Sequence, residues 1–322
     1  MSAGGSRKAI LAAMAANGGI AISKFVAFLM TGASSMLAES IHSVADTSNQ
    51  GLLLLGGARA RRDASRTHQF GYGRERYFWS FVVALVLFSL GGLFALYEGI
   101  EKIRHPHEIE SYGIAAGVLT LGLLLEGASF RTAIIESKAV KGTRSWWTFV
   151  RTARTPELPV VLLEDLGAMI GLVLALVGVS LAHWVDPIWD GIGTTSIGVL
   201  LAAIAVLLTI EMKSLLIGES ATDEKAANLR TALLQTPGVE RILNLRTQHL
   251  APEEILVAGK VDIADTMNFR EVTEVIDAAE TAMRAAVPEA TMIYLEPDEY
   301  DPAHVASPDR NDGDHAADDT AH

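Results

Sequence analysis

Long apolar runs fill the first two thirds of this sequence and constrain its fold more than any other feature. A helix needs roughly 20 apolar residues to cross a bilayer, and six stretches of the chain approach or exceed that length. They are expected at about residues 8–31, 35–58, 77–103, 111–135, 159–182 and 188–212. The sequence therefore predicts an all-α transmembrane domain of six helices over residues 8–217, after a short N-terminal cytoplasmic segment, residues 1–7.

Composition narrows the class of protein further. Half of the 322 residues are hydrophobic and the mean hydropathy is positive, a combination that soluble domains rarely show. Cysteine is absent, which excludes disulfides, thiolate metal sites and cysteine nucleophiles. The net charge of −12 argues against a nucleic-acid partner. A membrane protein with the lipid bilayer as its main surroundings is the class that these numbers favour.

Basic residues gather in two loops, and this asymmetry orients the predicted helices. The loop after the second span holds Arg59, Arg61, Arg62, Arg66, Arg74 and Arg76. The loop after the fourth span holds Lys138, Lys141, Arg144, Arg151 and Arg154. The alternate loops are nearly free of Lys and Arg, apart from Arg104. Because cytoplasmic loops are enriched in Lys and Arg, the basic loops are expected in the cytoplasm, and an even number of spans puts both termini there.

The sequence changes character after Ile217. Its pattern predicts a helix capped by Thr222, strands at 239–248 and 254–263, a helix at 268–286 and a strand at 291–297. Asn268 and Glu271 suit a capping box at the start of the second helix. The order αββαβ predicts a small open-faced α+β domain over residues 218–298. Residues 299–322 are rich in Asp, Ala, His and Pro and are expected to form a disordered acidic tail.

Ionisable residues inside the predicted spans are the main clue to function. A carboxylate at the centre of a membrane helix costs about 2.5–3.5 kcal/mol on insertion scales, so such a residue is expected to face a polar cavity. His42 and Asp46 lie four residues apart in the second span and project from one helix face. An imidazole and a carboxylate at this spacing suit one small cation. The alternative interpretation is a packing or hydrogen-bonded pair.

The fifth span carries the acidic neighbours Glu164 and Asp165. Consecutive side chains on a helix point about 100° apart, so one is expected to face the cavity and the other a neighbouring helix. We expect Asp165 in the cavity. One nitrogen and two carboxylates suit a divalent first-row metal, zinc ahead of manganese, iron or cobalt. Glu164, Asn17 of the first span, or water is left open as the fourth ligand.

Other polar residues in the spans are expected to serve packing. Lys24 and Asn17, both in the first span, are interpreted chiefly as interhelical hydrogen-bonding groups. Glu98, Glu101 and Glu126 are interpreted as structural partners of basic residues. These residues are therefore not the first candidates for the cation site.

Several motifs together resemble the cation diffusion facilitator family. They are "SMLAESIHSVADTSNQGLLLLG", "THQFGYGRERYFWS", "YEGIEKIRHPHEIE", "TPGVERILNLRTQ" and the closing "YLEP". "VVLLEDLGAMIG" resembles the branch that includes the animal mitochondrial zinc transporter. The resemblance covers about residues 8–298. It implies a six-span homodimer with a cytoplasmic ferredoxin-like dimerisation domain, exporting divalent metal from the cytosol in exchange for protons.

The resemblance also assigns roles to individual residues. His42 and Asp46 match the family's ligand pair in the second span, and Asp165 matches the second member of the pair in the fifth. The first member falls at Val161, which cannot bind metal. Either Glu164 substitutes for it, or the site has three protein ligands. The missing titratable group also implies looser coupling to protons.

Two further metal positions of the family are altered here. His68 matches a loop histidine that binds an extra metal in some members, but the second histidine of that loop is replaced by Tyr72. The positions of the cytoplasmic metal cluster read Leu243, Lys260 and Tyr294. The soluble domain is therefore expected to dimerise the protein without that cluster.

The resulting hypothesis is a transporter, not an enzyme, with no cofactor: zinc, or manganese, iron or cobalt, is its substrate and protons are the exchanged ion. A membrane-embedded metal-sensing protein without transport is the alternative. The sequence lacks the His-Glu-x-x-His and Gly-x-Ser-x-Gly motifs of an intramembrane metalloprotease or serine hydrolase. No transit peptide is visible, which favours a bacterial inner membrane as the location.

Overall fold

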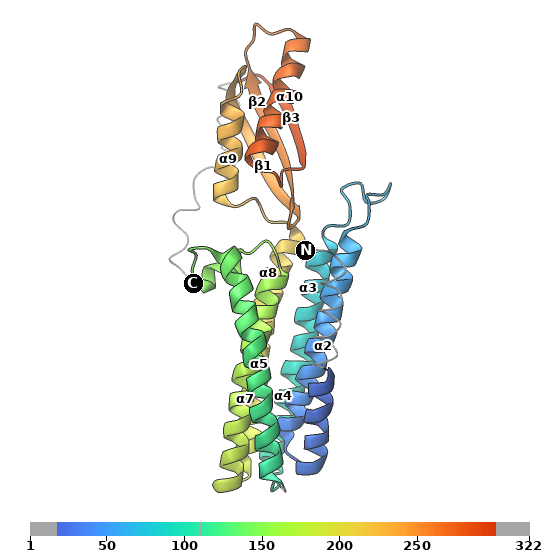
Figure 1. The fold of residues 1–322 in the computed structure, drawn as a ribbon. Helices are drawn as coiled ribbons and strands as arrows, with labels where there is room; N and C mark the ends of the chain where they lie inside the picture. Colours follow the sequence, from blue (N-terminus) through green and yellow to red (C-terminus); the bar gives the residue numbers. More distant parts are fainter. Residues whose placement is uncertain (1–17, 110, 301–322) are drawn as a thin grey trace. The chain divides into compact units, whose positions relative to one another are not determined.

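The computed structural model describes residues 18–109 and 111–300 and divides the chain into two compact units, one mainly before and one mainly after Glu219. The first unit is helical (Figure 1). It contains a helix at Gly18–Thr31, α2 (Ser34–Ala60), α3 (Glu75–Val86), the π-helical segment η1 (Leu87–Leu93), α4 (Phe94–Arg104), α5 (Tyr112–Lys141), α6 (Trp146–Thr152), α7 (Glu157–Trp184) and α8 (Ile188–Ile217).

Four of the described helical segments are long and apolar enough to cross a membrane. They are the continuous α3–η1–α4 segment, α5, α7 and α8. α2 is as long, but its polar residues lower its hydropathy, and the described part of the helix before it is shorter. The chain is thus a membrane protein with four candidate spans among its described residues, whereas the predicted count of six is not confirmed.

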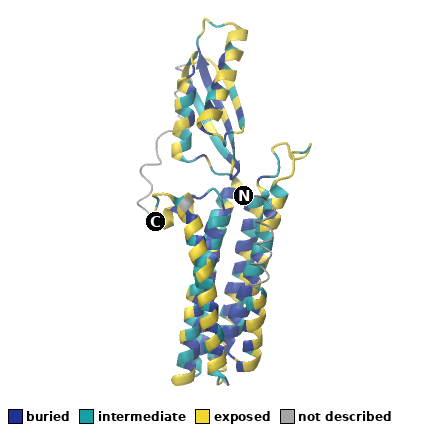
Figure 2. Cartoon of the chain, in the orientation of Figure 1, coloured by how far each residue is buried: buried dark blue, intermediate teal, exposed yellow. Residues whose placement is uncertain are grey.

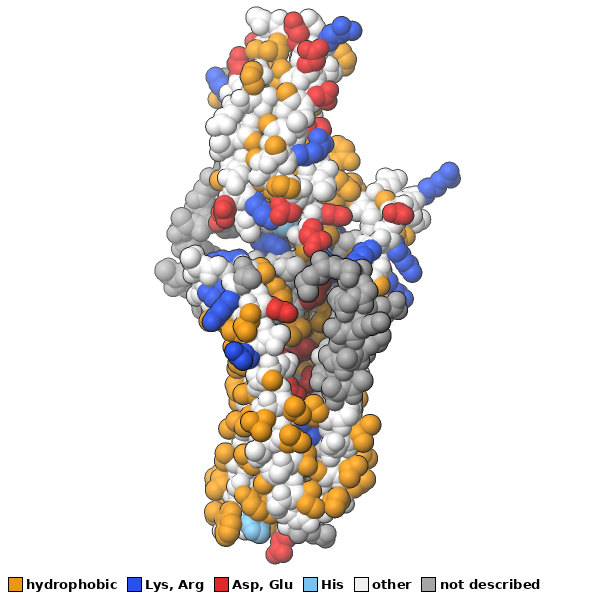
Figure 3. Space-filling model, in the orientation of Figure 1, with side chains coloured by type: hydrophobic (Ala, Val, Ile, Leu, Met, Phe, Trp, Pro, Cys, Tyr) orange, Lys and Arg blue, Asp and Glu red, His pale blue; other side chains and the backbone are white. Residues whose placement is uncertain are grey.

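The helical unit turns its apolar side chains outward as well as inward. Buried residues follow the inner faces of the helices (Figure 2), yet large apolar side chains such as Leu124 and Val199 are exposed on the outside. Figure 3 shows orange apolar side chains along the visible flank of this unit. An apolar outer surface of this extent is what contact with lipid requires of a helical protein.

Glycines let α4 and α8 approach each other closely. A Cβ atom on Gly198 would lie 2.6 Å from the backbone nitrogen of Leu96, and one on Gly99 would lie 2.5 Å from that of Thr195. No side chain fits in such a gap. Membrane helices gain van der Waals contact through small residues of this kind, because lipid gives them no hydrophobic driving force to associate.

A buried aspartate of α8 caps the start of α2. The Asp190 carboxylate is fully buried. It accepts hydrogen bonds from the backbone nitrogens of Ser34 (2.8 Å) and Ser35 (3.3 Å) and from both serine hydroxyls (2.9 and 2.5 Å). The first N–H groups of a helix have no partner within it, and a negative charge there is favourable. Asp190 therefore ties α8 to α2 and fixes where α2 begins.

Replacing Asp190 with alanine is expected to lower the free energy of unfolding by about 3 kcal/mol, because buried donors of Ser34 and Ser35 lose their acceptor. Thermal unfolding of the purified protein in detergent measures this. Asp186 provides the matched control, since it is exposed and its carboxylate accepts one hydrogen bond among the described residues, from Ile188 N at 2.9 Å. Asp186→Ala should cost about 1 kcal/mol or less; equal losses for the two variants would contradict the assignment.

The second unit has the predicted αββαβ order. Its elements are α9 (Asp223–Leu234), β1 (Val239–Ala251), β2 (Glu254–Ile263), α10 (Phe269–Ala286) and β3 (Met292–Asp298). The sheet order is β1-β2-β3, and β2 runs parallel to β3 with Val257 opposite Ile293. The parallel pair is possible because α10 supplies the long crossover that it needs.

Both helices of this unit pack against the sheet through one apolar face. Leu229 and Leu233 of α9 and Met283 of α10 are fully buried in a core with the inward residues of β2. The predicted capping box is confirmed, because the Asn268 side chain accepts from the Glu271 N–H and the Glu271 side chain accepts from the Asn268 N–H. Thr222 does occupy the position before α9, but its side chain makes no capping hydrogen bond, so that part of the prediction was wrong.

Candidate functional site

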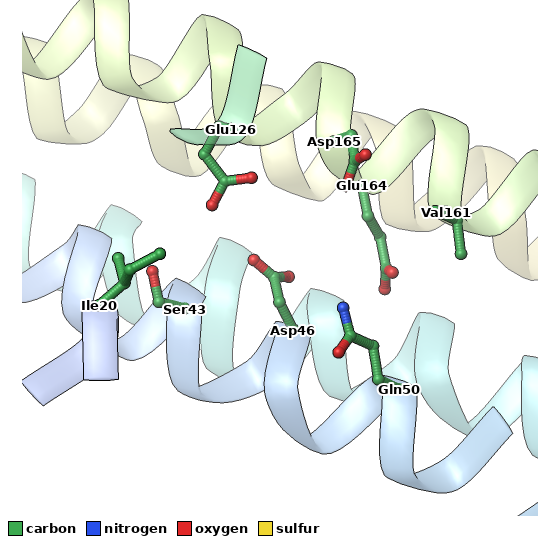
Figure 4. Close-up of a pocket in the computed structure, with 8 residues that line it drawn as sticks. All are labelled: Ile20, Ser43, Asp46, Gln50, Glu126, Val161, Glu164 and Asp165. Carbon is green, nitrogen blue, oxygen red and sulfur yellow. The ribbon is translucent and has the colours of Figure 1, made fainter. Parts of the chain in front are cut away.

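An acidic cavity lies inside the helical unit, between α2, α5 and α7 (Figure 4). It holds about 390 Å³ of space, including its open mouth. It is lined by Ile20, Ser43, Asp46, Gln50, Glu126, Val161, Glu164 and Asp165. Figure 3 shows acidic side chains recessed between the helices, within an otherwise apolar flank. Four carboxylates this near to one another repel when all are ionised, so the cavity favours a cation or bound protons.

α2 brings His42 and Asp46 together, as the four-residue spacing predicts. His42 Nε2 lies 3.5 Å from Asp46 Oδ2. The imidazole is only 1% exposed, and neither of its nitrogens has a hydrogen-bond partner among the described residues. Asp46 lines the cavity, whereas His42 lies behind it, near Gly91 of η1. Short π-helical insertions are frequent at functional sites, and this one places Gly91 beside the His42 ring, where a Cβ atom would lie 3.9 Å from His42 Nδ1.

α7 supplies the two adjacent acids, and both line the cavity. Glu164 is buried and accepts a hydrogen bond of 2.7 Å from Asn49 Nδ2 of α2. Asp165 accepts a hydrogen bond of 3.0 Å from Ser129 Oγ of α5. The expectation that only Asp165 faces the cavity was therefore wrong. The long Glu164 side chain overcomes the 100° offset by extending toward α2, as Figure 4 shows.

The sequence predicted another role for Glu126 of α5, that of a structural partner of a basic residue. It lines the cavity, and it forms no salt bridge with a basic residue in the part of the chain that the structure describes. The signal that points to it is its position within the apolar run "LGLLLEGASF". A lone carboxylate in such a run has the same energetic cost as Asp46 or Asp165 and deserves the same functional interpretation.

A buried ion pair borders the cavity. Lys24 Nζ lies 3.1 Å from Glu39 Oε2 and donates a hydrogen bond of 2.8 Å to Ser43 Oγ, a residue of the cavity lining. The Lys24 and Glu39 side chains are at most 1% exposed. Lys24 therefore makes the interhelical hydrogen bonds predicted for it. Asn17, the other candidate from the first span, lies outside the described residues.

His68 is not part of this cavity. It lies in the loop between α2 and α3, where its ring contacts that of Tyr72 in a tilted arrangement at a centroid distance of 4.6 Å. His42 precedes the end of α2 at Ala60 by 18 residues, about 27 Å of helix. Among the described residues, no three His, Asp or Glu side chains are close enough to hold a metal ion between them. Holding one requires the cavity carboxylates to draw together.

In the second unit, Lys260 takes part in a cross-strand charge cluster. Its amine lies 3.2 Å from Glu296 Oε1 and 3.0 Å from Asp298 Oδ2. The hydrogen bonds that Lys260 donates to Asp298 and Glu296 raise the pKa of Lys260 above its usual value. A protonated lysine cannot bind metal. Tyr294 is exposed on the neighbouring strand and Leu243 has no donor.

Fold and site together define the class: a polytopic membrane protein with an acidic cavity inside its helical bundle, followed by a small α+β unit. The chain belongs to the cation efflux family, as the sequence motifs indicate. Residues 10–217 match the family model of the cation efflux transmembrane domain, and residues 221–298 match that of the cytoplasmic domain of cation efflux proteins.

Individual relatives support the same family. The mitochondrial proton-coupled zinc antiporter SLC30A9 of Mus musculus is 31% identical over 84% of this chain and 48% of its own length. Metal tolerance protein C4 of Arabidopsis thaliana is 27% identical over 81% of this chain and 58% of its own. The chain thus spans about half the length of these two relatives. The cation-efflux pump FieF of Klebsiella pneumoniae is 21% identical over 92% of this chain and 94% of its own.

Proposed function

We propose that this protein transports divalent metal cations, zinc foremost, across its membrane by exchange with protons. The observation that carries this proposal is that Asp46, Glu164 and Asp165, from α2 and α7, line one cavity within a bundle of apolar helices. Charged side chains inside a membrane domain are retained when they bind an ion in transit. Membership of the cation efflux family and the names of the relatives support the same activity.

The proposed cycle is alternating access. A metal ion enters from the cytoplasmic side, loses water and binds Asp46 and Asp165, with His42 and Glu164 as the adjoining donors. Metal requires neutral imidazole and ionised carboxylates, so protons and metal compete for the same atoms. Protons arriving from the other side displace the metal outward. The helices then rock to open the cavity alternately to each face.

The proposal also includes the overall organisation. Six spans with both termini in the cytoplasm rest on the apolar runs and the two arginine- and lysine-rich loops. A bacterial inner membrane is part of the proposal, although the relative from Mus musculus is named as mitochondrial. We propose a homodimer that associates through the second unit. Phe269 (84% exposed), Tyr294 and Leu234 are large apolar residues that the unit leaves on its surface, and such residues favour an interface.

Flux into proteoliposomes tests the function. Zinc uptake by vesicles that contain the protein is expected to exceed uptake by empty vesicles, and an acidic vesicle interior should accelerate it, since protons leaving down their gradient drive metal inward. Manganese, iron and cobalt, assayed in the same way, rank the substrates. Metal binding without any flux would contradict transport and favour the sensor interpretation. Flux that ignores the pH gradient would contradict proton exchange.

A further inference from the structure

One face of α5 is turned toward the cavity and presents two polar side chains there. Glu126 and Ser129 lie three residues apart and therefore share a helix face. Ser129 donates its hydrogen bond to Asp165 of α7. Figure 4 shows the Glu126 carboxylate pointing across the cavity toward α2, where Ser43 and Asp46 lie. α5 is thus the third helix, beside α2 and α7, that brings an acid to this space.

Glu126 differs from the two acids of α7 in its partners. Asn49 donates to Glu164 and Ser129 donates to Asp165, so each of these carboxylates is held in place by an amide or a hydroxyl. Glu126 forms no such hydrogen bond or ion pair within the described residues. Both of its oxygens therefore have lone pairs available to a cation in the cavity.

The cavity also contains a position without a donor. Val161 of α7 lines the same space and offers only methyl groups. A divalent metal needs about four donors in a tetrahedral site and more in an octahedral one. Behind Asp46, the 1%-exposed His42 has no hydrogen-bond partner among the described residues on either ring nitrogen, so its imidazole is also available to an ion bound at Asp46. A carboxylate facing Asp46 from α5 is well placed to complete such a donor set.

We propose that Glu126 is a direct ligand of the transported metal, supplying from α5 the donor that Val161 does not supply from α7. This inference rests on the proposed transport function and adds a third helix to the site. A metal held by Asp46, Glu126 and the acids of α7 links α2, α5 and α7 through one ion. Its donor set is rich in oxygen, which suits manganese and cobalt alongside zinc.

The test compares two glutamates of the same helix in the full-length protein in detergent. Glu136 is exposed on α5 and lies outside the cavity lining, so Glu136→Gln is the matched control. Glu126→Gln should weaken zinc binding, measured by calorimetry, at least about tenfold. Its melting temperature without metal should not fall, because the amide removes repulsion between carboxylates. The rise in melting temperature that zinc causes should shrink. Glu126→Asp should retain part of the affinity.

Two results would overturn the inference. One is wild-type zinc affinity in Glu126→Gln. The other is a lower melting temperature of its metal-free form, which would make Glu126 a packing residue. Failure of the transport proposal is recognised separately, since it appears as absent flux in the unaltered protein. If the unaltered protein transports zinc but the Glu126→Gln and Glu136→Gln variants bind zinc equally well, only the role of Glu126 is contradicted.

Discussion

Zinc flux falls to the level of empty vesicles when Asp46 is replaced by asparagine: this is the largest functional effect that we expect. Asp46 lines the cavity, and its Oδ1 atom has no hydrogen-bond partner among the described residues. The amide keeps the shape of the side chain and removes the charge that binds the metal. Loss of a group that merely supports a ligand costs roughly 10–100-fold, so loss of a ligand should cost at least about 100-fold.

Two companion variants sharpen this experiment. Ser48 is exposed on the same helix, and Ser48→Ala should transport as the unaltered protein does. His42→Ala should also lose flux while the protein still folds, because the imidazole Nε2 lies 3.5 Å from Asp46 Oδ2 and can bind the same ion. Retained flux in the Asp46→Asn protein would remove the cavity as the transport site. Retained flux in His42→Ala alone would exclude the imidazole from the ligands.

Replacing Lys24 with methionine is expected to have the largest effect on stability. The ammonium is within 3.1 Å of the Glu39 carboxylate, and both are almost fully buried. Removing one partner of a buried ion pair leaves an uncompensated charge and costs about 3–5 kcal/mol. The melting temperature of the protein in detergent should fall by roughly 10 °C. Ser43 also loses the donor that holds it at the edge of the cavity.

The double variant separates the charge from the packing. Lys24→Met combined with Glu39→Gln removes both charges, and its melting temperature should recover most of the loss, since replacing a whole buried pair is often nearly neutral. Lys260→Met is the matched control, because this lysine also contacts two carboxylates but is exposed. It should change the melting temperature little. A double variant as unstable as Lys24→Met would contradict the electrostatic explanation.

Local patterns explain why much of the fold was predictable. α7 and α8 follow the predicted spans to within a few residues. An apolar run of that length satisfies its backbone hydrogen bonds in a membrane by forming a helix. The αββαβ order of the second unit followed from alternating and helical periods and from a capping box, all of which depend on residues near each other in the chain. The polar α2, with Glu39, His42 and Asp46, is where hydropathy alone gives the weakest signal.

The candidate site was predictable where it depends on one helix and not where it depends on several. His42 and Asp46 share a face because of their spacing, which any α-helix enforces. The sequence did not place Glu126 at the cavity, because nothing in it tells which way α5 is rotated about its axis. Glu164 lines the cavity with its carboxylate held by Asn49 of α2, a contact between helices that the sequence does not reveal.

The membrane class, the α+β second unit and the family could be deduced from the residues alone, because each depends on hydrophobicity, local periodicity or motifs of consecutive residues. Three features became apparent in the folded protein: which acids share a cavity, that Asp190 caps α2 across 155 residues of chain, and that Lys24 is paired with Glu39. The physical reason is that a side chain's energy in a membrane protein depends on its neighbours from other helices, and helix rotation and packing set those neighbours.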